Sequence, residues 1–122
     1  MDPGVPFFHI LVLILFATLL SAGQVLFKVA ALAAPPLNSL SSVGSLLLLP
    51  SLWGALLVYG SATLLWIWLM QEVPLSRGYP FAALGFVLVP AAGVLFFSER
   101  VSGLYVAGAA LIVVGLLLIS QS

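Results

Sequence analysis

The stretch VSGLYVAGAALIVVGLLLISQS, residues 101–122, contains no charged side chain. An apolar helix of about 20 residues crosses the hydrocarbon core of a bilayer, because each residue rises about 1.5 Å. Within the stretch, Leu116-Leu117-Leu118-Ile119 is apolar on every side, whereas a strand of a membrane barrel alternates apolar and polar residues. A helix also satisfies its own backbone hydrogen bonds in lipid. The stretch therefore predicts a membrane-spanning helix.

The chain as a whole has a similar composition. Of its 122 residues, 64% are hydrophobic and 5% are charged, against about 25% charged in a typical soluble domain. The mean hydropathy is +1.36. A soluble fold of this size could not bury so much apolar surface. The chain is therefore predicted to be an all-α integral membrane protein.

The few charged residues divide the chain into uncharged segments. They are Asp2, Lys28, Glu72, Arg77, Glu99 and Arg100. The long segment between Lys28 and Glu72 is interrupted by PPLNSLSS, residues 35–42, which has turn and loop chemistry. We therefore expect four transmembrane helices in a single domain, residues 1–122, with both termini on the same side. The expected spans lie near residues 6–31, 49–71, 76–97 and 103–120.

The first span has a competing interpretation. Ala31-Leu32-Ala33 has the shape of a signal-peptide cleavage site. The apolar run is longer than a signal-peptide core, however, and Lys28 precedes the cleavage point, so we expect the span to be retained. Arg77 and Arg100 fall on opposite sides of the membrane in this layout, so the positive-inside rule gives no orientation.

Charge and residue types exclude several classes of protein. The formal net charge is zero, which leaves no basic face for nucleic acid. The chain has no cysteine and no cluster of histidine and carboxylate ligands, so we expect no metal and no cofactor. No nucleophile–base pair and no pair of carboxylates falls inside a span, which argues against an enzyme.

Polar residues gather on one face of the first span. Ser21, Gln24 and Lys28 lie within about 60° of one another on a helix, and Gly23 beside them is expected to admit another helix backbone. Polar and charged residues inside a membrane are costly and point to function. Cations without a carboxylate in the bilayer favour an anionic ligand such as a phosphate. The alternative is that Lys28 reaches to the membrane surface while Gln24 joins helices.

The third span holds further candidates. Ser76 is expected to cap its start, and Arg77 lies at the positive end of the helix dipole, a cost that a bound anion would offset. The alternative is that Arg77 pairs with Glu72. Pro90 lies in the middle of the span, where it removes a backbone hydrogen bond and predicts a hinge.

Two other features suit packing. Trp66 and Trp68 are expected in the aromatic belt at the membrane surface, with a substrate groove as the alternative. Gly108 and Gly115 lie on one face of the fourth span, where small residues permit another helix to approach closely. We expect this face to form a dimer contact.

Four short motifs are Gly23-Gln24…Lys28, Val73-Pro74…Tyr79-Pro80, Phe97-Ser98-Glu99-Arg100-Val101-Ser102 and Gly108…Gly115. Together they resemble a known family, the four-helix branch of the drug/metabolite transporter superfamily, related to EamA-like transporters. This branch includes the small multidrug resistance exporters and the aminoarabinose–undecaprenyl phosphate flippase subunits. The resemblance covers nearly the whole chain.

The two groups differ at one position. Small multidrug exporters carry a glutamate in the middle of the first span, where this chain has Leu20, so proton/cation exchange has no carboxylate to use. The Gly-Gln-x3-Lys and Tyr-Pro motifs are closer to the flippase subunits, although Arg77 replaces a residue that is usually apolar there. The candidate substrate-binding residues are then Ser21, Gln24, Lys28, Arg77 and Tyr79.

The resemblance implies the small multidrug resistance fold and pairing into a homo- or heterodimer. It also implies a polyprenyl-phosphate-linked sugar or another anionic lipid as substrate, moved across the bacterial inner membrane. Two alternatives stay open. One is a small multidrug or metabolite exporter, which Leu20 disfavours. The other is a non-transporting membrane partner of a glycosyltransferase, which the short neutral loops disfavour.

Overall fold

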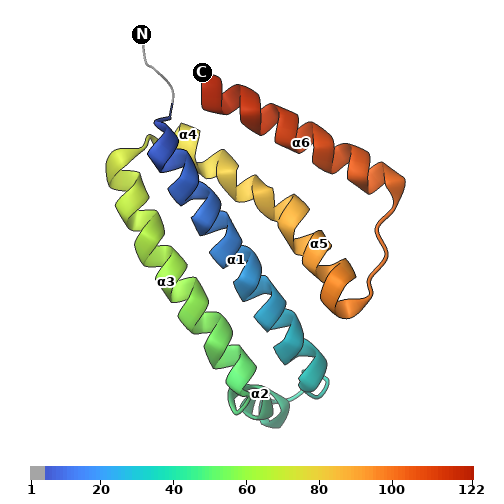
Figure 1. The fold of residues 1–122 in the computed structure, drawn as a ribbon. Helices are drawn as coiled ribbons and strands as arrows, with labels where there is room; N and C mark the ends of the chain where they lie inside the picture. The colour runs from blue at the N-terminus through green and yellow to red at the C-terminus, as the bar shows by residue number, and fades with distance from the viewer. Residues whose placement is uncertain (1–4) are drawn as a thin grey trace.

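The computed structural model describes residues 5–122, and the secondary structure of that part is entirely helical (Figure 1). The elements are α1 (Phe7–Ala33), α2 (Leu40–Leu47), α3 (Pro50–Glu72), α4 (Leu75–Gly78), the 3-10 helix η1 (Tyr79–Leu84), α5 (Gly85–Phe97) and α6 (Gly103–Gln121). Four segments are long and apolar enough to cross a membrane: Phe7–Ala33, Pro50–Glu72, Leu75–Phe97 and Gly103–Gln121. The predicted all-α membrane fold with four spans is confirmed.

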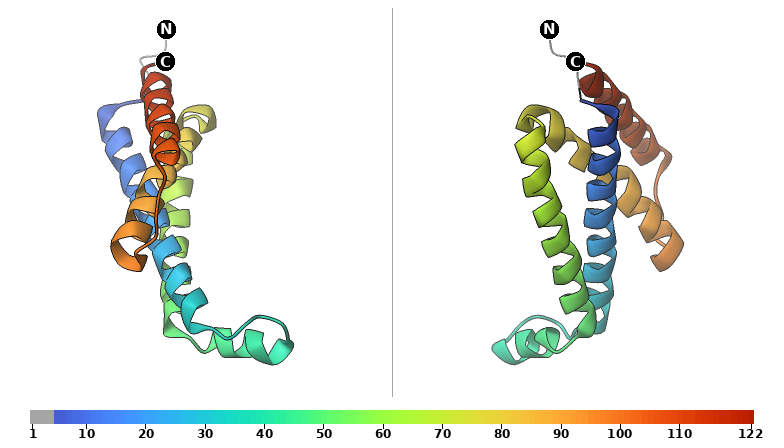
Figure 2. Two further views of the ribbon diagram at one scale, coloured as in Figure 1. Left: turned by 90° about the vertical axis from the view of Figure 1, so that its right-hand side faces the viewer. Right: turned by 60° about the vertical axis from the view of Figure 1, so that its left-hand side comes forward.

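The long helices α1 and α3 lie side by side, α5 runs obliquely across α1, and α6 diverges from the other three (Figures 1 and 2). The start of α1 and the end of α6 lie at the same end of the molecule. The hydrophobic core gathers at that end and includes Leu13, Leu69, Phe81 and Leu116. The opposite ends of α5 and α6 lie outside this core, which leaves room for cavities beside α1.

The two tryptophans at the end of α3 have different surroundings. Trp66 is half-buried and stacks on Phe16 of α1, with ring centroids 4.8 Å apart. Trp68 is more exposed and meets Phe8 edge-on, with centroids 6.4 Å apart. Trp66 thus contributes to helix packing, and a place in the aromatic belt stays a prediction for Trp68.

The connection between α1 and α3 is not the plain loop expected from residues 35–42. Ser39 caps the short helix α2, and its side chain and that of Ser42 form a reciprocal capping box. At the other end of α2, the Trp53 indole donates a hydrogen bond to the Leu47 carbonyl at 2.7 Å. Serine favours loops and helix caps alike, which is why the composition was misleading. Figure 2 shows α2 projecting sideways from the ends of α1 and α3.

The third span begins differently from the prediction. Helix α4 starts directly after Pro74, whose carbonyl accepts the N–H groups of Arg77 at 3.0 Å and Gly78 at 2.9 Å. No side chain caps this start, so the prediction that Ser76 is the N-cap is wrong. Pro74, with φ −59° and ψ 141°, already directs the chain into the helix.

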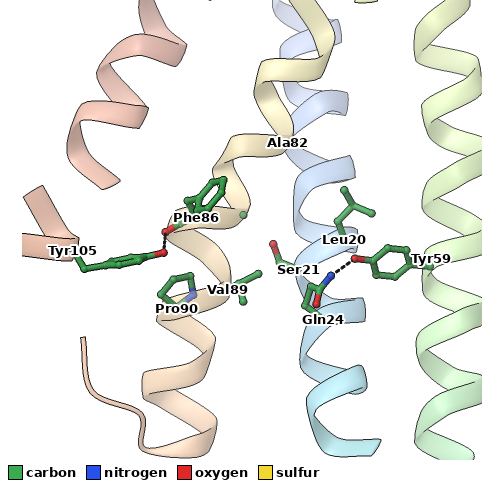
Figure 3. A pocket seen from close by; sticks show the side chains of 10 residues that line it. Leu20, Ser21, Gln24, Tyr59, Ala82, Phe86, Val89, Pro90 and Tyr105 are labelled. Atoms are coloured by element: carbon green, nitrogen blue, oxygen red, sulfur yellow. Dashed lines mark hydrogen bonds between the residues drawn. The ribbon is translucent and has the colours of Figure 1, made fainter. Parts of the chain in front are cut away.

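The break from regular helix geometry in this span lies at η1, and Pro90 lies inside the continuous helix α5. Pro80 stands in the first turn of η1, where its missing N–H is tolerated. Pro90 removes the hydrogen bond that residue 90 would donate to the carbonyl of Phe86. The Tyr105 hydroxyl of α6 donates to that carbonyl instead, at 2.9 Å (Figure 3). Tyr105 therefore satisfies a backbone group that lipid could not. A hinge at Pro90 stays a prediction.

We expect Tyr105→Phe to destabilise the protein by about 1–3 kcal/mol, because it leaves the Phe86 carbonyl without a donor in an apolar setting. In a Pro90→Ala background the new N–H of residue 90 can serve the carbonyl, so the same change should cost much less. Unfolding free energies of the four proteins in detergent micelles give this double-mutant cycle. An equal cost in both backgrounds would show that the tyrosine does not compensate for the proline.

Candidate functional site

A cavity of about 400 Å³ lies between α1, α3, α5 and α6, and we call it the central cavity (Figure 3). Its polar lining comes from Ser21, Gln24, Tyr59 and Tyr105. The remaining lining residues are apolar or glycine: Leu20, Ala82, Gly85, Phe86, Val89 and Pro90. An apolar cavity with a few oriented polar groups is the usual character of a ligand site.

The polar groups of α1 and α3 meet inside this cavity. The side-chain amide of Gln24 donates a hydrogen bond to the hydroxyl of Tyr59. The Tyr59 ring lies so close to Gly23 that a methyl group at position 23 would overlap it. Gly23 therefore admits an aromatic ring, which corrects the expectation that it admits another helix backbone. The glycine and the tyrosine together set the position of the Gln24 amide.

Ser21 and Leu20 provide no hydrogen-bond donor for an anion in this structure. Ser21 is buried, 6% exposed, and its hydroxyl donates to the Ala17 carbonyl at 2.8 Å. In this rotamer its oxygen can only accept a hydrogen bond, so it cannot donate one to a phosphate. Leu20 lines the central cavity, and none of the residues lining that cavity carries a carboxylate.

A second cavity, of about 380 Å³, adjoins the first, since Gln24 and Val89 line both. Lys28 and Glu99 line it, and we call it the charged cavity. The Lys28 Nζ lies 3.8 Å from Oε2 of Glu99, and the two side chains are 45% and 48% exposed. The expectation of a cation without an acid is therefore wrong for Lys28, because the fold brings Glu99 beside it.

The backbone after α5 holds Glu99 in this place. Ser98 ends the helix in the left-handed conformation, with φ 53° and ψ 32°, and the Glu99 N–H donates to the Gly93 carbonyl at 3.1 Å. The chain thus folds back over α5, and the Glu99 carboxylate lies directly against Gly93, where a Cβ atom would collide with it. Gly93 thus makes room for the carboxylate.

The predicted substrate-binding residues do not all come together. Arg77 and Tyr79 belong to α4 and η1, which lie near the start of α1 (Figure 1). Trp66, which Tyr79 contacts, stacks on Phe16 of α1, and Lys28 lies about 18 Å beyond Phe16 along that helix, at about 1.5 Å per residue. Tyr79 is exposed and meets Trp66 edge-on, with centroids 6.3 Å apart. Ser21, Gln24 and Lys28 line the two cavities, and Arg77 and Tyr79 line neither, so their part in substrate binding stays a prediction.

Helix α6 has the least packing within the chain. Of the 18 most apolar consecutive residues of each span, 6% are buried in α6, against 28% in α1. Gly108 and Gly115 have no heavy atom within 4 Å of where a Cβ would stand. The glycine face is therefore open in the single chain.

Similar proteins agree with this architecture. A relative from Aeromonas salmonicida, named a probable 4-amino-4-deoxy-L-arabinose-phosphoundecaprenol flippase subunit ArnE, is 36% identical over 111 residues, covering 89% of this chain and 94% of the relative. The chain belongs to the ArnE family of flippase subunits. A second ArnE relative, from Aeromonas hydrophila, is 37% identical over 112 residues, 90% of this chain and 95% of its own length. A third, from Pseudomonas aeruginosa, is 43% identical over 70 residues, 57% of this chain and 61% of its own length.

No protein-family model and no solved structure matches the chain. The ArnE relatives confirm the resemblance to the flippase subunits and the expectation of a transporter component that is not an enzyme. With the four apolar spans, they make this a multi-pass membrane protein.

Three residues of this ArnE family member contribute to the site although little in the sequence indicated it: Tyr59, Glu99 and Tyr105. For Tyr105 the sequence holds an indirect indication, because Pro90 leaves the carbonyl four residues earlier in need of a hydrogen-bond donor. Glu99 had a weak one, since a carboxylate at a helix C-terminus is unfavourable without a partner. Tyr59 had none, because nothing in the local pattern of α3 says that it faces Gln24.

Proposed function

We propose that this protein is a subunit of a flippase that moves a polyprenyl-phosphate-linked sugar across the bacterial inner membrane. Its ArnE relatives are named for 4-amino-4-deoxy-L-arabinose-phosphoundecaprenol. The observation that carries the proposal is the pair of adjoining cavities beside α1. A polar headgroup that crosses the membrane needs polar side chains along its way, whereas the polyprenyl chain can stay in lipid.

Lys28 is the proposed cation for the lipid phosphate, and Gln24 adds a neutral hydrogen bond. The Lys28 ammonium and the Gln24 amide border the same charged cavity. A charge-assisted hydrogen bond to phosphate partly offsets the cost of removing both charges from water. Tyr59 orients Gln24 through their hydrogen bond. Arg77 and Tyr79, near the opposite end of the helix bundle, would contact the headgroup at the other face of the membrane.

We propose further that a partner subunit packs on α6. The Gly108 and Gly115 face is open, and α6 buries little within its own chain. Small residues on one face allow two helix backbones to approach closely, and the van der Waals packing that results favours helix association in lipid. The partner is a second copy or a related subunit.

We expect the double substitution Gly108→Leu and Gly115→Leu to weaken association of the protein with its partner, because large side chains hold the helices apart. Cross-linking or energy transfer between labelled subunits in bilayers measures this. Gly60→Leu is the matched control, since Gly60 on α3 also has open space around it. Association that survives the double substitution unchanged would remove the α6 face as the interface.

The proposed function is tested by transport in proteoliposomes that contain this protein and its partner subunit. We expect movement of 4-amino-4-deoxy-L-arabinose-phosphoundecaprenol between leaflets. Proton-driven export of lipophilic cations instead would favour the small multidrug exporter, for which the carboxylate-free central cavity gives no support. Movement of neither would leave a non-transporting membrane partner.

A further inference from the structure

We propose that Glu99 recognises a protonated amine on the sugar headgroup while Lys28 holds the phosphate, so that the charged cavity selects an amine-bearing sugar phosphate over one with a neutral sugar. This inference rests on the proposed function and extends it to the choice of substrate. The two side chains line one cavity, with Nζ and Oε2 3.8 Å apart.

The charge count of the cavity favours a zwitterionic headgroup. Lys28 and Glu99 together have no net charge, and they are the only charged residues among those that line the charged cavity. A sugar phosphodiester with a neutral sugar brings one negative charge, which can pair with Lys28 only by leaving Glu99 unpaired. An isolated carboxylate in an apolar setting is costly. A headgroup with a phosphate and an ammonium replaces one ion pair by two and adds no net charge.

The geometry of the pair suits such an exchange. At 3.8 Å the separation exceeds the 2.7–2.9 Å or so of a charge-assisted hydrogen bond, so the two ions are adjacent without being tightly bonded. Each side chain is about half exposed, 45% for Lys28 and 48% for Glu99, so each can turn toward a ligand. The two charges can therefore separate enough to hold the two ends of a headgroup.

The carboxylate is also held in place by the fold. A glutamate at a helix C-terminus faces the negative end of the dipole and would be expected to turn away from it. Here the left-handed Ser98 and the hydrogen bond from the Glu99 N–H to Gly93 fold it back, and the bare Gly93 leaves room for it. This arrangement brings an unfavourably placed carboxylate into the cavity, beside Lys28, which is what recognition of an amine requires.

The test compares two lipids on the full-length protein with its partner subunit in nanodiscs. One is 4-amino-4-deoxy-L-arabinose-phosphoundecaprenol, and the other is its N-acetylated derivative, which keeps the phosphate and the chain but loses the amine charge. We expect the wild type to prefer the amine lipid by about ten- to a hundredfold in Kd, the size of one charge-assisted contact. Glu99→Gln should abolish that preference and leave binding of the N-acetylated lipid no weaker. Glu72→Gln, a carboxylate outside both cavities, should keep it.

Each outcome is decisive. A Glu99→Gln protein that still prefers the amine lipid, or a wild type that binds both lipids equally, overturns the role of Glu99 and leaves the proposed function standing. Binding of neither lipid by the wild type overturns the proposed function as well. Because the comparison of two lipids on the wild type needs no substitution, a variant that fails to fold does not weaken the test.

Discussion

Replacing Lys28 with alanine should weaken binding of a polyprenyl-phosphate-linked sugar by about ten- to a hundredfold, while the protein still assembles in membranes. A hydrogen bond to a charged group is worth about 1.5–3 kcal/mol, which corresponds to that change in Kd. The substitution also leaves Glu99 without its neighbour at 3.8 Å, which further disfavours an anionic ligand. Binding of the lipid to the purified protein in nanodiscs measures the effect.

Two variants serve as controls for Lys28. Lys28→Arg keeps the charge and should retain part of the binding, although the planar guanidinium has a different shape and reach. Arg100→Ala removes an exposed cation that lines neither the central nor the charged cavity, so it should bind like the wild type. Wild-type affinity in Lys28→Ala would show that this lysine only reaches to the membrane surface.

Gly23→Ala should destabilise the protein by about 1–3 kcal/mol, the usual cost of forcing an extra carbon into a packed site. The new methyl overlaps the Tyr59 ring, which has to move and thereby breaks the hydrogen bond to Gln24. Lipid binding should fall together with stability, because the Gln24 amide loses its orientation. Unfolding in detergent and lipid binding in nanodiscs are the two measurements.

The matched control for Gly23 is Gly60→Ala, because a Cβ at Gly60 meets no heavy atom within 4 Å. In a Tyr59→Ala background, Gly23→Ala should cost almost nothing, since the overlapping ring is gone. If Gly23→Ala is as costly without the tyrosine as with it, the ring is not the reason for the glycine.

The fold was predictable because the lipid bilayer constrains both the length and the composition of each span. Each span must be apolar for the thickness of the bilayer, and the charged residues together with the turn-forming residues 35–42 divide the chain at that length. The expected span near 103–120 and the helix Gly103–Gln121 differ by one residue at the end. The short helix α2 was missed, because serine is as common in loops as at helix starts. Nothing about bilayer thickness constrains a segment outside the spans.

The candidate site was predictable only along a single helix. The 3.6-residue period places Ser21, Gln24 and Lys28 on one face of α1 from the sequence alone. The pairs that complete the site join different helices, Gln24 with Tyr59 of α3 and Lys28 with Glu99 after α5. Such pairs depend on how each helix is rotated about its axis, and α3 and α5, unlike α1, have no polar face that indicates the rotation.

The most direct test of the account is to locate the bound headgroup. A polyprenyl-phosphate-linked sugar with a diazirine on the sugar is added to membranes that contain this protein and its partner subunit, irradiated, and the labelled residues are identified by mass spectrometry. We expect labels on α1 and α5 around the charged cavity, at residues such as Val25 and Val89, and their loss in Lys28→Ala. Labels that avoid α1 and α5, or that persist unchanged without Lys28, would contradict it.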